Sequence, residues 1–295
     1  MASDVEHRAG VVALLGRPNA GKSTLLNALV GQKLAIVTPK PQTTRSRLLG
    51  IVTLPHAQLL LVDTPGWQQG TKPLHGALNR LAEEAGRSCD VAVVLADLTQ
   101  GWGEVESALA RGAAAHGAPV LAVGNKRDLA PSGAHGWPPP AEARCAEVLT
   151  LSARTGEGVE SFLAACVARL PLSPPLYAAD ELSDRPVRFL AAELVREAAF
   201  SELEQELPYA LAVHVIEFDE KRADLVRIRA DLLVERTSQK KIVIGAGGAM
   251  LKRIGIRARQ EIEQLLGTRV HLELWVKLEP GWAKKPNRLK SLGYY

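Results

Sequence analysis

Short apolar runs alternate with longer stretches of helical spacing over the first 170 residues. The runs are nearly continuous in apolar residues, as expected for parallel strands that helices cover on both faces. They are VVALLG (11–16), QLLLVDT (58–64), VAVVLADL (91–98), PVLAVGNK (119–126) and VLTLSA (148–153). The pattern predicts an α/β domain with a doubly wound, mainly parallel sheet.

The pattern changes in the second half, where fewer and longer segments predict a small α+β domain. A Pro-rich and acidic stretch separates the halves, so we expect domains at 1–174 and 187–295 joined by a linker at 175–186. The Gly/Pro-rich stretch 130–140 reads as a surface loop. The expected elements are a helix over 189–207, two antiparallel strands over 209–220 and 223–235 that meet at Glu220–Arg222, a helix over 251–267 and a strand over 269–279.

Basic charge is concentrated in the last fifth of the chain. The 295 residues carry a formal charge of +4, but residues 236–295 hold 13 Lys/Arg and 4 Asp/Glu, giving +9. Residues 176–235 hold 7 and 14, giving −7. This distribution is typical of a nucleic-acid contact surface, although a solvated basic face has the same composition.

The remaining composition points to an ordinary reduced, cytoplasmic protein. Three cysteines at wide spacing indicate neither a disulfide framework nor a zinc site. The N-terminus is polar, and the apolar VVALL behind it is too short for a signal peptide or a membrane span.

The stretch GRPNAGKST (16–24) fits the phosphate-loop pattern G-x-x-x-x-G-K-[ST] between a predicted strand and a predicted helix. Backbone N–H groups at a helix N-terminus bind phosphate, the lysine reaches the β- and γ-phosphates, and the serine hydroxyl binds Mg²⁺. The residues expected to hold the nucleotide here are Gly16, Arg17, Pro18, Asn19, Ala20, Gly21, Lys22, Ser23 and Thr24.

A second motif, DTPGW (63–67), ends the second apolar run. Asp63 is expected to hold a magnesium-bound water, and the Gly66 N–H to contact the γ-phosphate, with Thr64, Pro65 and Trp67 beside them. The polar KPQTTRSR (40–47) between the two motifs is expected to supply a threonine to Mg²⁺ only in the GTP state. We expect Thr44 to be the magnesium ligand, with Thr43 as the alternative. This stretch could also be an ordinary solvent-exposed loop with no role in metal binding.

Two further strand ends predict selection of guanine. In NKRD (125–128), the Asp128 carboxylate can accept both the N1–H and the exocyclic amine of guanine, which adenine lacks. Asn125 and Lys126 are expected to brace the loop and pack along the base. Ser152 and Ala153 close the series, with the Ala153 N–H meeting guanine O6.

The basic C-terminal region contains a candidate RNA-binding loop. Gly245, Ala246, Gly247 and Gly248 form G-x-x-G, which lets the backbone approach RNA phosphates, although such a stretch can also be a simple turn. The tail from Gly281 suits stacking of Trp282 on single-stranded RNA, or is a surface extension. The basic residues expected to contact RNA are Lys240, Lys241, Lys252, Arg253, Arg257, Lys284 and Lys285.

Together, GRPNAGKST, PQTTR, DTPG, NKRD, SA, IVIGAGGAMLKRIGIRAR and WVKLEPGWAKKPNRLKSLGY make nearly the whole chain resemble the Era family of bacterial ribosome-associated GTPases. The resemblance implies a P-loop GTPase domain followed by a type II KH domain, with GTP/GDP and Mg²⁺ as ligands. It also implies binding of the 3′ end of 16S rRNA during 30S subunit maturation and loose association with the inner membrane face. We also expect a monomer. One departure is Ala246, where the family usually carries lysine.

Trp67 stands where many GTPases carry a catalytic glutamine, and an indole cannot polarise water as a carboxamide does. The family shares an apolar residue here, so we expect slow hydrolysis that depends on Lys22, Thr44, Gly66 and Asn19. In related GTPases an asparagine at the Asn19 position helps coordinate K⁺, which predicts potassium as an additional ion; the alternative is that Asn19 only shapes the loop.

Two functions follow from these motifs. The first is a GTP-hydrolysing switch whose segments 33–50 and 66–80 make the GTP form bind RNA more tightly. The alternative is a constitutive RNA-binding protein whose nucleotide site is mainly structural.

Overall fold

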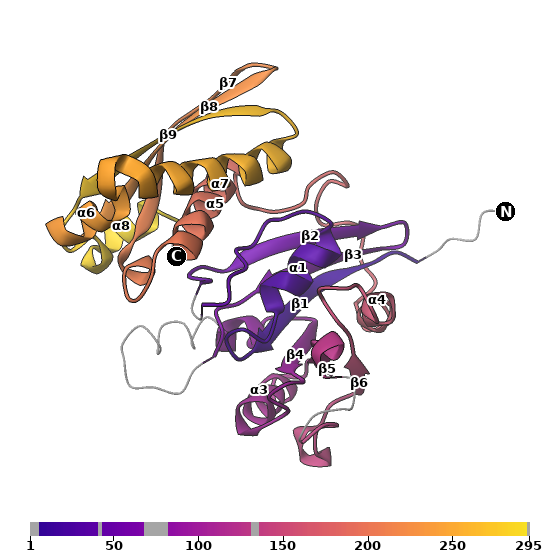
Figure 1. Ribbon diagram of the computed structural model, residues 1–295. Helices are drawn as coiled ribbons and strands as arrows, with labels where there is room; N and C mark the ends of the chain where they lie inside the picture. The colour runs from indigo at the N-terminus through magenta and orange to yellow at the C-terminus, as the bar shows by residue number, and fades with distance from the viewer. Residues whose placement is uncertain (1–5, 41–42, 68–81, 131–135, 294–295) are drawn as a thin grey trace. The chain divides into compact units, whose positions relative to one another are not determined.

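A computed structural model describes residues 6–40, 43–67, 82–130 and 136–293. The chain forms two compact units, one made of Met1–Ala35 and Thr44–Asp184, the other of Ile36–Thr43 and Arg185–Tyr295 (Figure 1). Of the segments expected to act as switches, 41–42 and 68–80 lie outside the described residues.

The first unit is built on a six-stranded sheet in the order β2-β3-β1-β4-β5-β6. All neighbouring strands are parallel except β2 and β3, which are antiparallel. The strands are Arg8–Gly16 (β1), Leu48–Leu54 (β2), Ala57–Asp63 (β3), Val91–Asp97 (β4), Val120–Asn125 (β5) and Glu147–Thr150 (β6). The doubly wound, mainly parallel sheet predicted from the sequence is therefore confirmed.

Helices cover this sheet and explain its continuous apolar runs. Every residue of β3, β4 and β5 is buried, because side chains on both faces lie under helices. The helix α1 packs on β1, β2 and β3, while α3 packs on β1, β4 and β5. The helices are Lys22–Val30 (α1), Glu104–Ala114 (α3) and Val159–Val167 (α4), with short 3₁₀ turns at Arg127–Leu129 (η1) and Ala141–Ala143 (η2).

Strand β2 was not predicted. Its sequence LLGIVTL contains a glycine and follows the polar stretch 40–47, so it does not stand out as a run. It becomes a strand through its antiparallel pairing with β3, in which Leu48 faces Asp63 and Leu54 faces Ala57. Such pairing requires only a tight turn between the strands.

The second unit has the element order α-β-β-α-α-β. Its sheet runs β7-β8-β9, with β7 and β8 antiparallel and β8 and β9 parallel. The elements are Val187–Glu202 (α5), Pro208–Ala210 (η3), Ala212–Arg222 (β7), Leu225–Val234 (β8), Thr237–Ile244 (α6), Ala246–Gly248 (η4), Ala249–Leu266 (α7), Arg269–Leu278 (β9), Trp282–Lys284 (η5) and Pro286–Ser291 (α8). A core on one face of the sheet packs against α5, α6 and α7.

Two expected boundaries in this unit were wrong. The helix predicted over 189–207 ends at Glu202, because Leu203 turns to an extended backbone and enters the core at 1% exposure. Strand β7 continues through the expected turn at Glu220–Arg222, and the chain reverses after it, where Arg222 pairs with Leu225. The helix α6 precedes the G-x-x-G loop, as the type II KH order implied by the resemblance predicts.

The segment Ile36–Thr43 belongs to the second unit, and its residues Lys40 and Thr43 contact α5. The Arg196 guanidinium, fully buried and paired with Glu193 at 2.5 Å, donates to the Thr43 carbonyl at 2.6 Å. Lys40 donates to the carbonyls of Phe200 and Leu203 at the C-terminal end of α5. A cation at the C-terminal end of a helix interacts favourably with the carbonyls there.

Candidate nucleotide and RNA sites

The phosphate loop lies between the end of β1 and the start of α1. Gly21, the residue before α1, has a φ of +95°, and a Cβ there would lie 2.1 Å from Asn125 Nδ2. Only glycine allows this turn together with the close approach of Asn125. The first turn of α1 carries no acidic side chain, so its N–H groups form a positive site suited to phosphate.

Lys22 lies in this loop with 6% of its surface exposed. Its ammonium donates to the carbonyls of Gly16 at 3.1 Å and Arg17 at 2.8 Å. Burial lowers the pKa of Lys22 to about 8, although the charges of Asp63 and Glu106 oppose this shift. A bound polyphosphate would therefore contact a desolvated ammonium group, and its negative charge would stabilise the protonated form of Lys22.

Three oxygen groups meet beside the loop. The Ser23 hydroxyl donates to Asp63 Oδ2 at 2.7 Å and lies 3.3 Å from the Thr44 hydroxyl. Asp63 is completely buried, and burial raises the pKa of its carboxyl against the opposing effect of Lys22. Its Oδ1 has no hydrogen-bond partner among the described residues. An orphaned buried carboxylate oxygen beside two hydroxyls fits Mg²⁺, which prefers such oxygen ligands.

Of the two threonines proposed for the metal, Thr44 is the one beside Ser23. Thr43 directs its carbonyl to Arg196 instead. The geometry therefore favours Ser23, Thr44 and Asp63 as the set that would hold Mg²⁺ and its waters. Bound there, the ion would neutralise phosphate charge during hydrolysis.

The DTPGW segment passes close over the phosphate loop. A Cβ at Gly66 would lie 2.4 Å from the Pro18 nitrogen, so only glycine fits. Thr64 donates its hydroxyl to the Leu14 carbonyl at 2.8 Å, and the Trp67 N–H donates to the Gly16 carbonyl at 3.1 Å. The Trp67 side chain packs against the apolar core next to Leu15, and an indole has no oxygen that could accept a hydrogen bond from a water.

Asn125 connects three loops around the expected guanine site. Its Nδ2 donates to the Ala20 carbonyl at 2.8 Å, and its Oδ1 accepts from the backbone N–H groups of Lys126 at 2.8 Å and Ala153 at 3.0 Å. The predicted bracing role thus has a direct geometric basis. The Ala153 N–H, however, was expected to meet guanine O6 and here donates to Asn125.

Asp128 lies next to Ser152 at this site. Its Oδ1 accepts from the Ser152 hydroxyl at 2.7 Å, and its Oδ2 pairs with Arg154 at 3.1 Å. The Arg154 side chain is 74% exposed, so this pair is weak and readily replaced by another donor. The carboxylate is positioned by Ser152 and available for the two donors of guanine.

The G-x-x-G loop joins α6 to α7. Gly245, Gly247 and Gly248 have φ values of +74°, +56° and +82°, a conformation that other residues adopt only with strain. A Cβ at Gly245 would also lie 2.7 Å from the Met250 Cβ. Ala246 and Gly247 are exposed, so their backbone can be approached by a phosphate.

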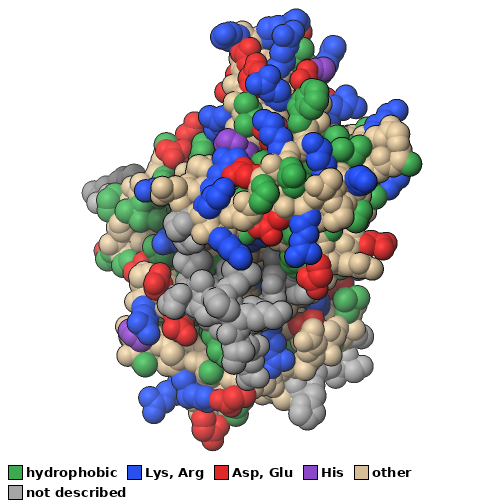
Figure 2. All heavy atoms as spheres, turned by 90° about the vertical axis from the view of Figure 1, so that its left-hand side faces the viewer, with side chains coloured by type: hydrophobic (Ala, Val, Ile, Leu, Met, Phe, Trp, Pro, Cys, Tyr) green, Lys and Arg blue, Asp and Glu red, His purple; other side chains and the backbone are tan. Residues whose placement is uncertain are grey.

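Basic side chains surround this loop. Lys241, Lys252, Arg253 and Arg257 are exposed, and Lys240 is half-buried. Arg253 is paired with Glu202 at 2.9 Å, so part of its charge is already compensated. Figure 2 shows Lys and Arg side chains over the surface of the molecule, intermixed with Asp and Glu.

Comparison with known proteins agrees with these two sites. A family model described as a 50S ribosome-binding GTPase matches residues 11–126, and a KH domain model matches residues 206–283. GTPase Era of Xylella fastidiosa (strain M12) is 43% identical over 302 residues, covering 100% of both chains. GTPase Era of Geobacter metallireducens is 43% identical and covers 99% of both.

The chain belongs to the Era family of GTPases. Its fold also matches a crystal structure of Era in complex with MgGDPNP and nucleotides 1506–1542 of 16S ribosomal RNA, with a TM-score of 0.86, 34% identity and coverage of 98% and 99% of the two chains. Aquifex aeolicus Era bound to GDP·AlF4⁻ matches with the same TM-score and identity, over 97% and 99%. As an Era-family GTPase the chain hydrolyses GTP.

One candidate RNA contact of this Era-family chain needs correction. Trp282 is 3% exposed and packs with Ala212, Leu233 and Leu292, while its Nε1 donates to the Ala210 carbonyl at 3.4 Å. Its indole anchors the tail and has no open face for stacking. The lysines that follow it, Lys284 and Lys285, are exposed.

Sequence reasoning missed Asp97, which supports the guanine loop of this Era-family chain. Its Oδ2 accepts from Lys126 at 2.6 Å, and its Oδ1 accepts from Thr99. Burial would raise the pKa of Asp97, but the hydrogen bonds from Lys126 and Thr99 outweigh it and lower the pKa. The available signal was the position of Asp97 at the end of an apolar run, as for Asp63.

Proposed function

We propose that this Era-family GTPase is a molecular switch that binds the 3′ end of 16S rRNA and acts in maturation of the 30S subunit. The observation that supports this most strongly is the combination, in one chain, of a guanine-nucleotide site and a basic G-x-x-G loop. The relative whose fold it shares was solved with MgGDPNP and this RNA. A constitutive RNA-binding protein with a merely structural nucleotide is less favoured, because the 43% identical relatives are GTPases.

The proposed switch couples nucleotide to RNA through the segment before Thr44. Thr44 lies beside Ser23 at the expected magnesium site, whereas Thr43 and Lys40 before it are hydrogen-bonded to α5 and to the residue that follows this helix. A ligand that moves Thr44 therefore pulls on a segment that packs with the KH unit. This connectivity supports a GTP form that binds RNA more tightly than the GDP form.

The test is fluorescence anisotropy with an RNA copy of the 16S 3′ end, using full-length protein loaded with a non-hydrolysable GTP analogue or with GDP. The proposal expects tighter binding in the GTP-analogue state. Lys40→Ala should reduce the difference between the two states while leaving GDP affinity unchanged. Equal RNA affinities of wild-type protein in both states would contradict the switch.

A potassium ion near Asn19 is part of the proposal for hydrolysis. Asn19 has a φ of +62° within the phosphate loop, and a monovalent cation there would supply charge stabilisation that Trp67 cannot. GTP turnover in KCl should exceed turnover in NaCl at equal ionic strength. Identical rates in the two salts would contradict a role for potassium. An Asn19→Ala variant should hydrolyse GTP at the same rate in KCl and in NaCl.

We further propose that the protein works as a monomer in the cytoplasm, with loose association at the inner membrane face. None of the helices in the described part of the chain is long and apolar enough to cross a membrane. Equilibrium sedimentation with and without vesicles of anionic lipid tests both statements. Dimer formation at micromolar concentration would contradict the monomer. Absence of the protein from pelleted vesicles would contradict the membrane association.

A further inference from the structure

The sheet of the KH unit has a second face that the helices α5, α6 and α7 do not cover. Along β8, Val226, Ile228 and Ala230 point into the core. Because side chains alternate across a strand, Arg227, Arg229 and Asp231 lie on the opposite face. The C-terminal tail covers one end of that face, where Leu233 packs against Trp282.

Trp275 stands on this second face. It pairs in register with Asp231, and its side chain is 60% exposed, more than any other large apolar side chain in the described part of the protein. The next residue, Val276, is 7% exposed and points into the core. The indole is therefore held on a rigid strand with a large part of its surface in water.

Two of the acidic groups near Trp275 are paired with cations, and a third, Glu273 on the same strand face, contacts His271 at 3.1 Å. Asp231 is paired with Lys277 at 2.6 Å, and Glu279 with Arg288 at 2.9 Å. Arg288 also lies 3.5 Å from His214, which pairs in register with Asp231. His214, Asp231 and Trp275 are cross-strand neighbours on β7, β8 and β9. Arg288 of the tail thus contacts the β7 end of this row, two strands or about 10 Å from Trp275.

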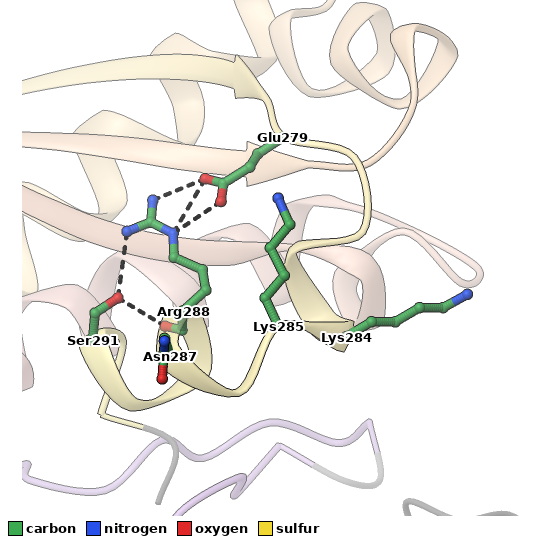
Figure 3. A pocket seen from close by; sticks show the side chains of 6 residues that line it. All are labelled: Glu279, Lys284, Lys285, Asn287, Arg288 and Ser291. Carbon is green, nitrogen blue, oxygen red and sulfur yellow. Dashed lines mark hydrogen bonds and ion pairs between the residues drawn. The ribbon is translucent and has the colours of Figure 1, made fainter.

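Cationic side chains beside this row are open to solvent. Glu279, Lys284, Lys285, Asn287, Arg288 and Ser291 line a hollow in which Arg288 turns toward Glu279 and Ser291 (Figure 3). Lys284 and Lys285 extend from the loop, and neither pairs with another residue drawn there. Residues 269–290 hold six Lys/Arg and two Asp/Glu, so the segment that supplies this face is basic.

We propose that this sheet face is a second RNA-contact surface, in which an unpaired base stacks on Trp275 and adjacent phosphates bind Lys284 and Lys285. An exposed aromatic ring on the same sheet face as a lysine-bearing tail is an arrangement that suits single-stranded nucleic acid. The inference rests on the proposed RNA-binding function and adds a contact outside the G-x-x-G groove.

The strand order allows one RNA strand to contact both the G-x-x-G groove and Trp275. β9 is an edge strand, and α6 and α7, which hold the G-x-x-G loop, pack on its other face. A KH groove holds about four nucleotides. A longer single strand that leaves the groove can therefore pass around the β9 edge to Trp275.

The test compares anisotropy titrations of full-length protein with two RNAs from the 16S 3′ end, of about four and about twelve nucleotides. Trp275→Leu should weaken binding of the longer RNA roughly 5- to 150-fold, which corresponds to about 1–3 kcal/mol per stacked base. The same substitution should leave the affinity for the shorter RNA unchanged. Trp275→Phe keeps an aromatic face and should retain most of the affinity.

The lysines have a separate readout. Lys284→Ala combined with Lys285→Ala should flatten the dependence of log K on log salt by about 1.4 for the longer RNA, since each single-strand phosphate contact contributes about 0.7. Wild-type affinity of Trp275→Leu for the longer RNA would overturn the inference while leaving the proposed function intact. Failure of wild-type protein to bind either RNA would overturn the proposed function itself.

An independent measurement covers the case in which Trp275→Leu does not fold. RNA should quench indole fluorescence in wild-type protein, and Trp275→Phe should lose this quenching while it still binds. Equal quenching in the two proteins would place the stacked base elsewhere and contradict the inference.

Discussion

The charge state of Lys22 should make nucleotide affinity depend on pH. Burial lowers the pKa of Lys22 to about 8 in the protein without nucleotide. A bound polyphosphate favours the ammonium form, so its pKa in the complex should return to 10.5 or above. Binding is then insensitive to this group below pH 8 and requires proton uptake above it.

The size of the effect follows from this shift. At pH 9 about nine tenths of Lys22 is neutral in the free protein, against about one tenth at pH 7. The dissociation constant for Mg-GDP should therefore rise about tenfold between pH 7 and pH 9, or about 1.4 kcal/mol. Each binding event at pH 9 should take up about 0.9 proton.

Titration calorimetry in buffers of different ionisation enthalpy measures both quantities. Lys22→Arg is the matched control, because a guanidinium stays charged throughout this range. Titration of the guanine and phosphate groups occurs in both proteins, so it cancels in the comparison. Proton uptake in Lys22→Arg equal to that of wild-type protein, or no uptake at pH 9 in wild-type protein, would refute the reasoning.

Three further substitutions test the guanine site, the G-x-x-G loop and the tail. Asp128→Asn should weaken GDP binding at least about 100-fold, because the carboxylate that accepts two guanine donors is lost, and xanthosine diphosphate should bind better than GDP in calorimetry. Ala246→Lys should tighten RNA binding and steepen the salt dependence of log K by about 0.7, while an unchanged slope would show that position 246 does not reach a phosphate. Trp282→Ala should lower the free energy of unfolding of the KH unit by about 3–5 kcal/mol in urea denaturation, whereas Trp275→Ala should change it by less than about 0.5 kcal/mol. Similar losses for the two tryptophans would contradict their different burial.

The sequence predicts well the strands whose side chains are buried on both faces of the sheet. Strands β3, β4 and β5 are buried on both faces and read as continuous apolar runs. The phosphate loop could be placed because its glycine spacing is required by backbone geometry, as the φ of Gly21 shows. In contrast, β2 depends on pairing with β3, which sequence periodicity does not encode.

The site was predictable where chemistry dictates residue type and unpredictable where tertiary packing decides exposure. Asp63, Ser23 and Thr44 lie together, as the motifs predict, and their binding of a metal ion stays a prediction. Trp282 and Trp275 look alike in sequence, since a lysine follows each of them two residues later. Only packing separates them, burying Trp282 under the tail and leaving Trp275 on the open sheet face.

The most direct test of the central claim is calorimetric titration of purified protein with GDP and with ADP in the presence of Mg²⁺. A phosphate loop combined with Asp128 predicts clear binding of GDP and at least about 100-fold weaker binding of ADP. Absence of GDP binding, or equal affinity for the two nucleotides, would contradict the account.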